Sequence, residues 1–252
     1  MITLEQKQLF NSIVGVCRRE ILRYLRQPEQ TIINEIFASF LFWFLLYLLK
    51  PEGYLSFLTG TLFVSSFKVI FSNLKMSIFV GRLEHCLDYQ LATAIPKQLL
   101  YFIYCATSIL RSILIIGVLL LIFSCFSTLG TVKQLLSLLA WLLLADLFFA
   151  NVSILCNLSA NSWNKIGAID SYMITPLLYL SGCFCSWQGI KEPINTLIYF
   201  NPIFHFYNVG IYLLSGGTLF PLTYSIALSL SLVSVSTFLG LYAFRKGYGL
   251  IE

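Results

Sequence analysis

The sequence predicts an all-α membrane protein with six transmembrane helices, an N-terminal interfacial amphipathic helix, and re-entrant helices between spans five and six. Its 252 residues are 58% hydrophobic and only 11% charged, whereas a soluble globular domain is about 25% charged. The mean hydropathy is +0.83. The apolar stretches are long and continuous rather than alternating, which argues against a membrane β-barrel. This composition excludes a soluble enzyme, a disordered chain and a disulfide-rich secreted module.

The first expected element is an amphipathic helix over residues 4–28 that lies in the membrane interface. One face carries Arg19, Arg23 and Arg26, which we expect to point toward lipid phosphates. The opposite face is apolar and is formed by Phe10, Ile13, Val14, Cys17, Ile21 and Leu25. The alternative is a simple basic anchor on the cytoplasmic side of the membrane.

Six apolar stretches are then long enough to cross a hydrocarbon core of about 30 Å. The expected spans cover residues 32–49, 54–80, 99–129, 132–158, 168–187 and 219–244. Residues 194–214 are apolar too, but Asn201-Pro202 interrupts them, and proline removes a backbone donor. We therefore expect an external segment, 188–214, whose short helices re-enter the outer membrane face without crossing.

The orientation follows from the basic residues, because cytoplasmic loops carry an excess of Lys and Arg. With six spans and both termini inside, ten basic residues fall in cytoplasmic segments, and only Lys50, Lys133 and Lys191 fall outside. A seventh full span would place Arg245 and Lys246 outside. The sequence thus predicts a multi-pass protein with both termini in the cytoplasm. The net charge of +5 reflects these loops, and we expect no nucleic-acid partner.

The loop between spans two and three predicts a short amphipathic helix over residues 82–91. Leu83, Leu87 and Leu91 recur every four residues, which is the spacing of one helix face. The charged or titratable residues among them are Arg82, Glu84, His85 and Asp88. Pro96 suits the first turn of the next span. Such a helix either docks in a partner's groove or lies on the bilayer surface.

Several stretches together carry a family resemblance. They are the loop 84–96, the block Thr175-Pro176-Leu177-Leu178-Tyr179-Leu180-Ser181-Gly182-Cys183-Phe184, the later Asn201-Pro202-Ile203, Ser215-Gly216-Gly217, and the tail Arg245-Lys246-Gly247-Tyr248-Gly249-Leu250. The combination resembles ABC-2 type exporter permeases and covers nearly the whole chain. The sequence departs from that pattern at Cys183-Phe184-Cys185, where the family often has aliphatic residues, and at Glu35, early in the first span.

The resemblance implies the membrane half of an ATP-driven exporter in the bacterial inner membrane. Two permease copies, expected to be identical, would pair with two nucleotide-binding subunits and with membrane lipid. The substrate would be amphipathic: a drug, a lipid or a lipid-linked glycan. The chain itself contains no G-x-x-x-x-G-K-[ST] motif, so ATP and Mg would bind to the partner. No cofactor, metal or catalytic residue is expected in this chain.

The same resemblance implies the roles of particular residues. Residues 82–91 would be the coupling helix, with Glu84 matching the family's acidic position. The expected ATPase-coupling residues are Arg82, Leu83, Glu84, Leu87, Asp88, Leu91 and Pro96. The expected external re-entrant motif consists of Thr175, Pro176, Ser181, Gly182, Asn201 and Pro202.

Three charged residues, Lys68, Arg111 and Asp146, fall near the middle of expected spans. Such charges are costly in a membrane and usually face a bundle interior or water. Spans three and four are joined by a short turn, so we expect Arg111 and Asp146 to pair, the alternative being a separate partner for each. For Lys68 we expect a structural partner, or else a place on the translocation path where it attracts an anionic head group.

Two other classes of function fit the sequence less well than a permease. A membrane-embedded lipid-modifying enzyme needs a cluster of polar catalytic groups at one membrane face, and the external loops carry few such groups. An ATP-independent channel or secondary transporter predicts repeated halves with matching broken helices. The sequence contains no such repeat, because the proline break occurs only in the second half.

Overall fold

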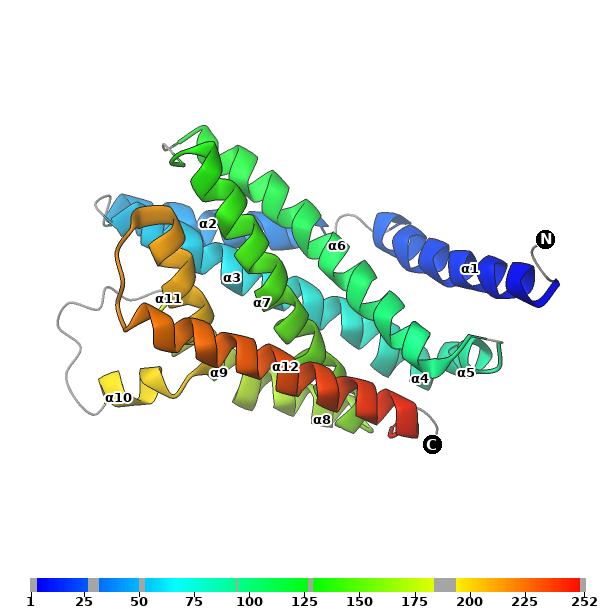
Figure 1. The fold of residues 1–252 in the computed structure, drawn as a ribbon. Coiled ribbons are helices and arrows are strands. Elements are labelled where there is room, and N and C mark those ends of the chain that lie inside the picture. The colour runs from blue at the N-terminus through cyan, green and yellow to red at the C-terminus, as the bar shows by residue number, and fades with distance from the viewer. Residues whose placement is uncertain are drawn as a thin grey trace.

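The computed structural model describes residues 4–26, 32–49, 53–93, 95–126, 129–183 and 194–249. Throughout these residues the chain is helical and contains no strand, so the predicted all-α class is confirmed (Figure 1). The helices form one elongated bundle with its ends at the left and right of Figure 1.

Four helices of the described part are long and apolar enough to cross a membrane. They are Tyr54–Leu83, Lys97–Ser124 (α6), Val132–Ser159 (α7) and Leu222–Lys246 (α12). The first is continuous, because α3 (Tyr54–Leu74) passes through the π-helical segment η3 (Lys75–Val80) into α4 (Gly81–Leu83). These helices overlap the second, third, fourth and sixth expected spans. The predicted architecture is therefore confirmed in part.

The regions of the first and fifth expected spans form shorter helices. α2 (Asn34–Leu49) has 16 residues and is apolar, although a straight crossing takes about 20. The fifth region consists of α8 (Trp163–Ile169), the π-helical segment η4 (Asp170–Ile174) and α9 (Thr175–Tyr179), which follow one another directly. Residues 184–187 of the expected fifth span lie outside the described residues.

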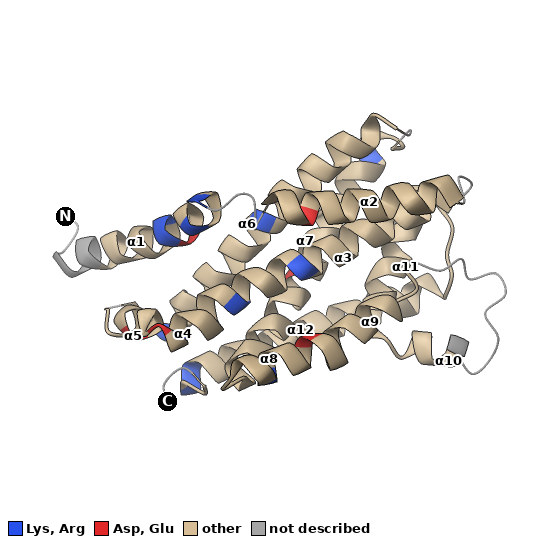
Figure 2. Ribbon diagram, turned by 180° about the vertical axis from the view of Figure 1, so that it is seen from behind, with Lys and Arg blue, Asp and Glu red and all other residues tan. Residues whose placement is uncertain are grey.

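The two ends of the bundle carry different elements. α1 (Leu4–Arg26), α4, α5 (Cys86–Leu91) and the C-terminus gather at one end in both ribbon views (Figures 1 and 2). The turn between α6 and α7 and the start of α12 lie at the other end. The two chain termini are therefore on the same side of the bundle.

α3 is the central helix of the bundle. From residue 57 to residue 74 every residue except Lys68 and Ser72 is buried. A side chain at Gly60 would collide with the backbone carbonyl of Cys183, so glycine lets the turn after α9 pack directly on α3. A helix that is apolar and buried all round is expected at the centre of a helical membrane bundle.

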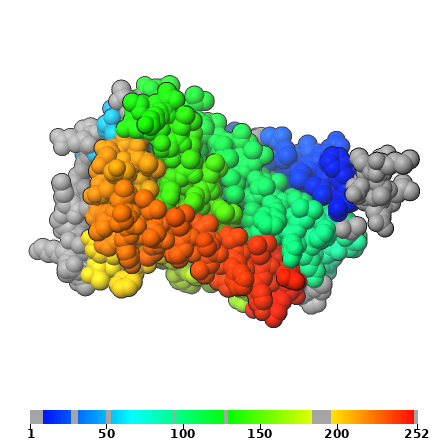
Figure 3. All heavy atoms as spheres, viewed as in Figure 1, coloured from blue at the N-terminus to red at the C-terminus, as the bar shows by residue number. Residues whose placement is uncertain are grey.

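α12 lies along one face of the molecule (Figure 3). Toward the bundle it buries mainly small residues: Ser225, Ser229, Ser236, Gly240 and Ala243. Its other face exposes large apolar side chains such as Val235 and Phe238. Small interfacial residues let helix backbones approach closely in a membrane, which is how this peripheral helix packs tightly on α7 and α6.

Two short helices replace a full span between α9 and α12. α10 (Ile194–Tyr199) and α11 (Pro202–Ser215) are separated at Asn201. The Asn201 side chain accepts a hydrogen bond from the Ile203 N–H (3.0 Å) and donates one to the Leu177 carbonyl (2.6 Å). It therefore caps α11, whose first residue is Pro202, and ties that helix start to α9. Residues 188–193 of the expected external segment lie outside the described residues.

Candidate coupling surface and intramembrane sites

The loop between α3 and α6 is not one continuous helix over 82–91. It consists of α4 and α5, and His85 between them has a left-handed backbone (φ 55°). His85 Nδ1 lies 2.9 Å from Asp88 Oδ2 at the start of α5. Because of this break, the leucines that were expected to share one helix face point in different directions: Leu83 is exposed and Leu87 is buried.

The side chains of this loop divide between the protein interior and the outside. Leu87 is fully buried against the bundle, and the Tyr104 hydroxyl donates to Gln90 Oε1 at 2.6 Å. The side chains that remain exposed are Leu83, Glu84, His85, Asp88 and Tyr89, the last of them 77% exposed. We call this set the α4–α5 surface. Of the other expected coupling residues, Leu91 is half-buried, and Pro96 is exposed at the N-cap of α6.

Arg82, an expected coupling residue, points inward. Its side chain is buried, and it donates hydrogen bonds to the backbone carbonyls of Leu158, Ala160 and Gly249. Its guanidinium also lies 5.9 Å from the centre of the Phe79 ring. Arg82 therefore joins the α4–α5 loop to the end of α7 and to the C-terminal tail. Gly249 is required here, because its φ is +63° and a side chain would collide with Leu158.

A second polar cluster joins α1 to the bundle, and its central residue, Glu20, is not among the sequence-predicted site residues. Glu20 is fully buried. Its Oε2 accepts from Arg23 Nη2 and from Ser77 Oγ, each at 2.7 Å. Arg111 Nη2 lies 3.7 Å from the same oxygen and donates to the Glu20 backbone carbonyl. An acid placed three residues before an arginine, in the stretch 18–26 whose other charged residues are all arginines, is the signal that could have identified it.

The cluster continues across α3 into α6. Arg23 Nη2 also donates to Asn73 Oδ1 (3.2 Å) and to Ser77 Oγ (2.7 Å), and Asn73 Nδ2 donates to Ser108 Oγ (2.6 Å). The Arg111 guanidinium stacks over the Tyr24 ring at 4.7 Å. Burial lowers the pKa of Arg23, while the neighbouring Glu20 carboxylate opposes that change. We call Glu20, Arg23, Asn73, Ser77, Ser108 and Arg111 the α1 network.

The α1 network corrects the expectation for the arginines of the N-terminal helix. Arg23 was expected to point toward lipid phosphates with Arg19 and Arg26. It turns inward instead, because Glu20 and the polar groups of α3 offer it hydrogen-bond acceptors. Arg19 is half-buried, and Arg26 is exposed.

The expected pair between Arg111 and Asp146 does not form. Arg111 is occupied by Glu20, which α1 brings to the middle of α6. Asp146 on α7 is fully buried, and within the described residues neither of its carboxyl oxygens has a hydrogen-bond partner. The groups that interact with it are the buried hydroxyls of Ser66 and Ser112. The prediction failed because similar depth in the membrane does not determine which way each side chain points.

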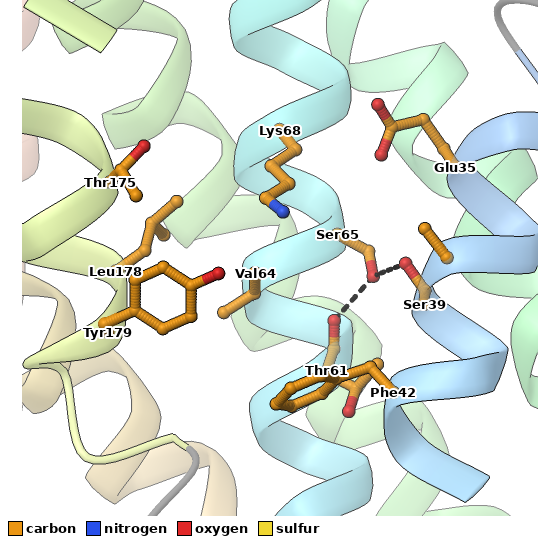
Figure 4. Close-up of a pocket in the computed structure, with 11 residues that line it drawn as sticks. Glu35, Ser39, Phe42, Thr61, Val64, Ser65, Lys68, Thr175, Leu178 and Tyr179 are labelled. Carbon is orange, nitrogen blue, oxygen red and sulfur yellow. Dashed lines mark hydrogen bonds between the residues drawn. The ribbon is translucent and has the colours of Figure 1, made fainter. Parts of the chain in front are cut away.

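Lys68 lines a cavity of about 250 Å³ between α2, α3 and α9 (Figure 4). Glu35 of α2 lies on the opposite wall and interacts electrostatically with Lys68. Below these two side chains in Figure 4, Ser65 Oγ donates to Ser39 Oγ at 2.7 Å, and it also lies 2.6 Å from the Thr61 carbonyl. The other walls include apolar and hydroxylated side chains: Ala38, Phe42, Val64, Thr175, Leu178 and Tyr179. We call this space the α2–α3–α9 cavity.

The residues of the expected external motif lie around the end of α9. Thr175 and Pro176 begin this helix, and Thr175 lines the cavity. Ser181 and Gly182 form the turn that follows, with Gly182 at φ +75° and the Ser181 hydroxyl bonded to the Leu178 carbonyl. Asn201 reaches back to Leu177, as described above. Cys183 is buried against α3, whereas Phe184 and Cys185 lie outside the described residues.

Comparisons with known proteins agree with this architecture. The model of the ABC-2 type transporter family matches residues 11–215. The chain is 22% identical over 216 residues to the inner membrane transport permease YadH of Escherichia coli K12, which covers 79% of this chain and 84% of the relative. The permease of the same name from Shigella flexneri matches to the same extent. The chain therefore belongs to the ABC-2 type transporter family: it is the transmembrane subunit of an ABC transporter, and this subunit is not itself catalytic.

Proposed function

We propose that this chain forms the translocation path of an ATP-driven exporter for an amphipathic substrate. It works as a homodimer with two nucleotide-binding subunits, each engaged through the α4–α5 surface. Each copy crosses the inner membrane six times, through α2, α3, α6, α7, the α8–α9 region and α12, and α10 and α11 re-enter the outer face. Both termini lie in the cytoplasm.

The α4–α5 surface is the observation that carries the proposal. It offers an exposed mixture of acidic, aromatic and aliphatic side chains, with Glu84, Asp88 and Tyr89 at its centre. A protein partner's groove accepts such an amphipathic turn. Arg82 holds the turn rigidly to α7 and the C-terminal tail. The α4–α5 surface is accessible to a partner, and Arg82 connects it to the bundle. It is therefore suited to transmit a movement of the partner to the membrane helices.

A direct mechanical route leads from this surface to the centre of the bundle. α4 continues η3 and α3 without a break, so a displacement of α5 acts on the most buried helix. The α1 network clamps the same helix at Asn73 and Ser77. Nucleotide-driven movement of α5 would therefore shift α3 and α1 together, and with them the wall that carries Lys68.

The orientation rests on two observations. Both chain termini lie at the end of the bundle that carries the α4–α5 surface (Figure 2), and an ATPase subunit is cytoplasmic, where ATP is supplied. The basic residues of the loops favour the same side. The related Escherichia coli protein is an inner membrane transport permease, which supports the inner membrane as the location.

Purification of the tagged chain from its native host in mild detergent tests the proposal. We expect a stoichiometric partner that contains a P-loop. The double variant Glu84→Ala with Tyr89→Ala should lose this partner, because both side chains are exposed on the α4–α5 surface. Leu87 is a poor choice for this purpose, since it is buried and its replacement would disturb the fold.

Tyr172→Ala is the matched control, because Tyr172 is 84% exposed but lies in η4, away from the loop. It should retain the partner. A folded, well-expressed preparation that brings no ATPase, under conditions in which another ABC transporter stays intact, would contradict the proposal.

A further inference from the structure

The α2–α3–α9 cavity carries two opposite charges that do not meet. Glu35 and Lys68 interact across it, yet neither takes part in an ion pair or hydrogen bond among the described residues. In Figure 4 the two side chains extend from different walls, with the Ser39–Ser65 hydrogen bond between their helices. The arrangement leaves room for a group that contacts both charges.

The position of Lys68 in the membrane makes its positive charge unfavourable in free energy unless a group of opposite charge or water contacts it. Lys68 stands near the midpoint of the apolar helix Tyr54–Leu83. An ionised side chain at such depth costs several kcal/mol and normally finds a partner or water. In the α1 network, by contrast, each charged side chain has a partner of opposite charge in contact. Lys68 and Glu35 are therefore placed to receive a ligand between them.

The size of the cavity limits what it can hold. Its volume is about 250 Å³, below the range of about 300–1,000 Å³ that suits a whole drug-sized ligand. It fits a polar head of a few functional groups. Exposed apolar side chains that an attached apolar chain could contact lie on α2, which lines the cavity, and on η4, which directly precedes α9: they are Phe37, Leu41 and Met173.

We propose that the α2–α3–α9 cavity binds the zwitterionic polar end of an amphiphile, with Lys68 holding its anionic group and Glu35 its cationic group. A purely anionic or purely cationic head would leave one of the two charges without a partner. The inference rests on the proposed function only in taking this amphiphile to be the transported substrate. A resident bilayer lipid has the same head-group chemistry and is the other source.

Binding of a matched set of amphiphiles to the chain alone tests the site. Dodecylphosphocholine is zwitterionic, dodecyl phosphate is anionic and dodecyltrimethylammonium is cationic, while all three share one alkyl chain. Each is added as a minor component of dodecyl maltoside micelles, and native mass spectrometry counts the bound molecules. We expect dodecylphosphocholine to bind at least tenfold more tightly than either singly charged probe.

Two single variants should separate the two charges. Lys68→Gln should weaken binding of dodecylphosphocholine and dodecyl phosphate about tenfold and leave dodecyltrimethylammonium unaffected or bound more tightly. Glu35→Gln should have the reverse effect on the two singly charged probes. Lys75→Gln is the matched control, because it removes the same charge seven residues further along, outside the cavity lining. It should change none of the three affinities.

The exchanged variant, Glu35→Lys with Lys68→Glu, shows whether a loss of binding in the single variants comes from the missing charge or from misfolding. It keeps both charges and should retain most of the binding of dodecylphosphocholine. Equal affinities for the three probes would overturn the proposal, as would a loss in Lys75→Gln equal to that in Lys68→Gln. Dissociation of the dimer by Lys68→Gln with unchanged probe binding would also overturn it, because Lys68 would then belong to an interface between copies.

A final arm distinguishes the two sources of the ligand. The complex with its ATPase subunit is assayed for ATP hydrolysis with increasing dodecylphosphocholine. Stimulation in the wild type, lost in Lys68→Gln, identifies the site as one for transported substrate; unchanged hydrolysis identifies a resident lipid. The binding measurement itself uses the chain alone, so failure to recover an ATPase would overturn the exporter proposal without affecting the result for the cavity.

Discussion

The α1 network and the α2–α3–α9 cavity both place charged side chains against α3, but they treat those charges differently. In the α1 network Glu20 contacts Arg23 and Arg111, and Ser77 contributes a further hydrogen bond. In the cavity Glu35 and Lys68 interact across open space. The first arrangement fastens one helix to two others, whereas the second leaves its charges available. The difference distinguishes charges that hold the fold together from charges that can receive a ligand.

Removing Glu20 should give the largest effect on stability. Glu20→Ala leaves Arg23 and Arg111 without their acidic partner, and breaking a buried ion pair from one side costs about 3–5 kcal/mol. We expect a large fall in the thermal unfolding midpoint in detergent and release of α1, measured as faster proteolysis near residue 26. Glu84→Ala removes an exposed carboxylate and should leave both measurements unchanged. A wild-type midpoint for Glu20→Ala would show that α1 is held by apolar packing alone.

Arg82 should give the next largest effect, because its buried side chain also joins separate parts of the fold. Arg82→Ala removes the donor to three backbone carbonyls, and hydrogen bonds to charged groups contribute about 2 kcal/mol. Hydrogen exchange should increase in residues 84–91 and in the C-terminal tail together. Arg26→Ala serves as the control, since Arg26 is exposed. Faster exchange in the loop with a protected tail would contradict the link between them.

Asp146 is a buried acid that has no basic partner within the part of the chain that the structure describes. Asp146→Asn keeps the shape of the side chain and removes a buried ionisable group that forms no ion pair among the described residues, so it should leave the thermal unfolding midpoint unchanged or raise it. Arg111→Gln should lower the midpoint, because it leaves Glu20 with one basic partner fewer. Exchanging the two residues, Arg111→Asp with Asp146→Arg, should not restore stability. Recovery in the exchanged variant would mean that the two residues pair after all.

The cavity charges should have the smallest effect on stability. Lys68 is exposed, and within the described residues it forms no ion pair, so Lys68→Gln should break no structural contact and should not lower the free energy of unfolding. Its effect should be confined to the binding of amphiphiles. A loss of stability comparable to that of Glu20→Ala would place Lys68 among the structural charges and remove the distinction drawn above.

Much of the candidate coupling loop could be predicted from the sequence, but its orientation could not. The spacing of Leu83, Leu87 and Leu91 predicts a helix with one apolar face. The structure breaks that helix at His85 and buries Leu87 while exposing Leu83. Periodicity assumes one straight helix, and it cannot detect a single left-handed residue that reorients the second half. Arg82, whose coupling role the family resemblance implied, points inward because the end of α7 and the C-terminal tail offer backbone carbonyls to its guanidinium.

Composition and local pattern alone determined that the chain is an all-α membrane protein, that α6, α7 and α12 are long apolar helices, and that Asn201-Pro202 begins a new helix. These features depend on hydrophobicity and backbone chemistry over a few neighbouring residues. Only the tertiary structure decided that Arg111 binds Glu20, which is 91 positions away, and that Lys68 faces Glu35 across a cavity. Such pairings depend on the rotation and packing of whole helices, which no local pattern specifies.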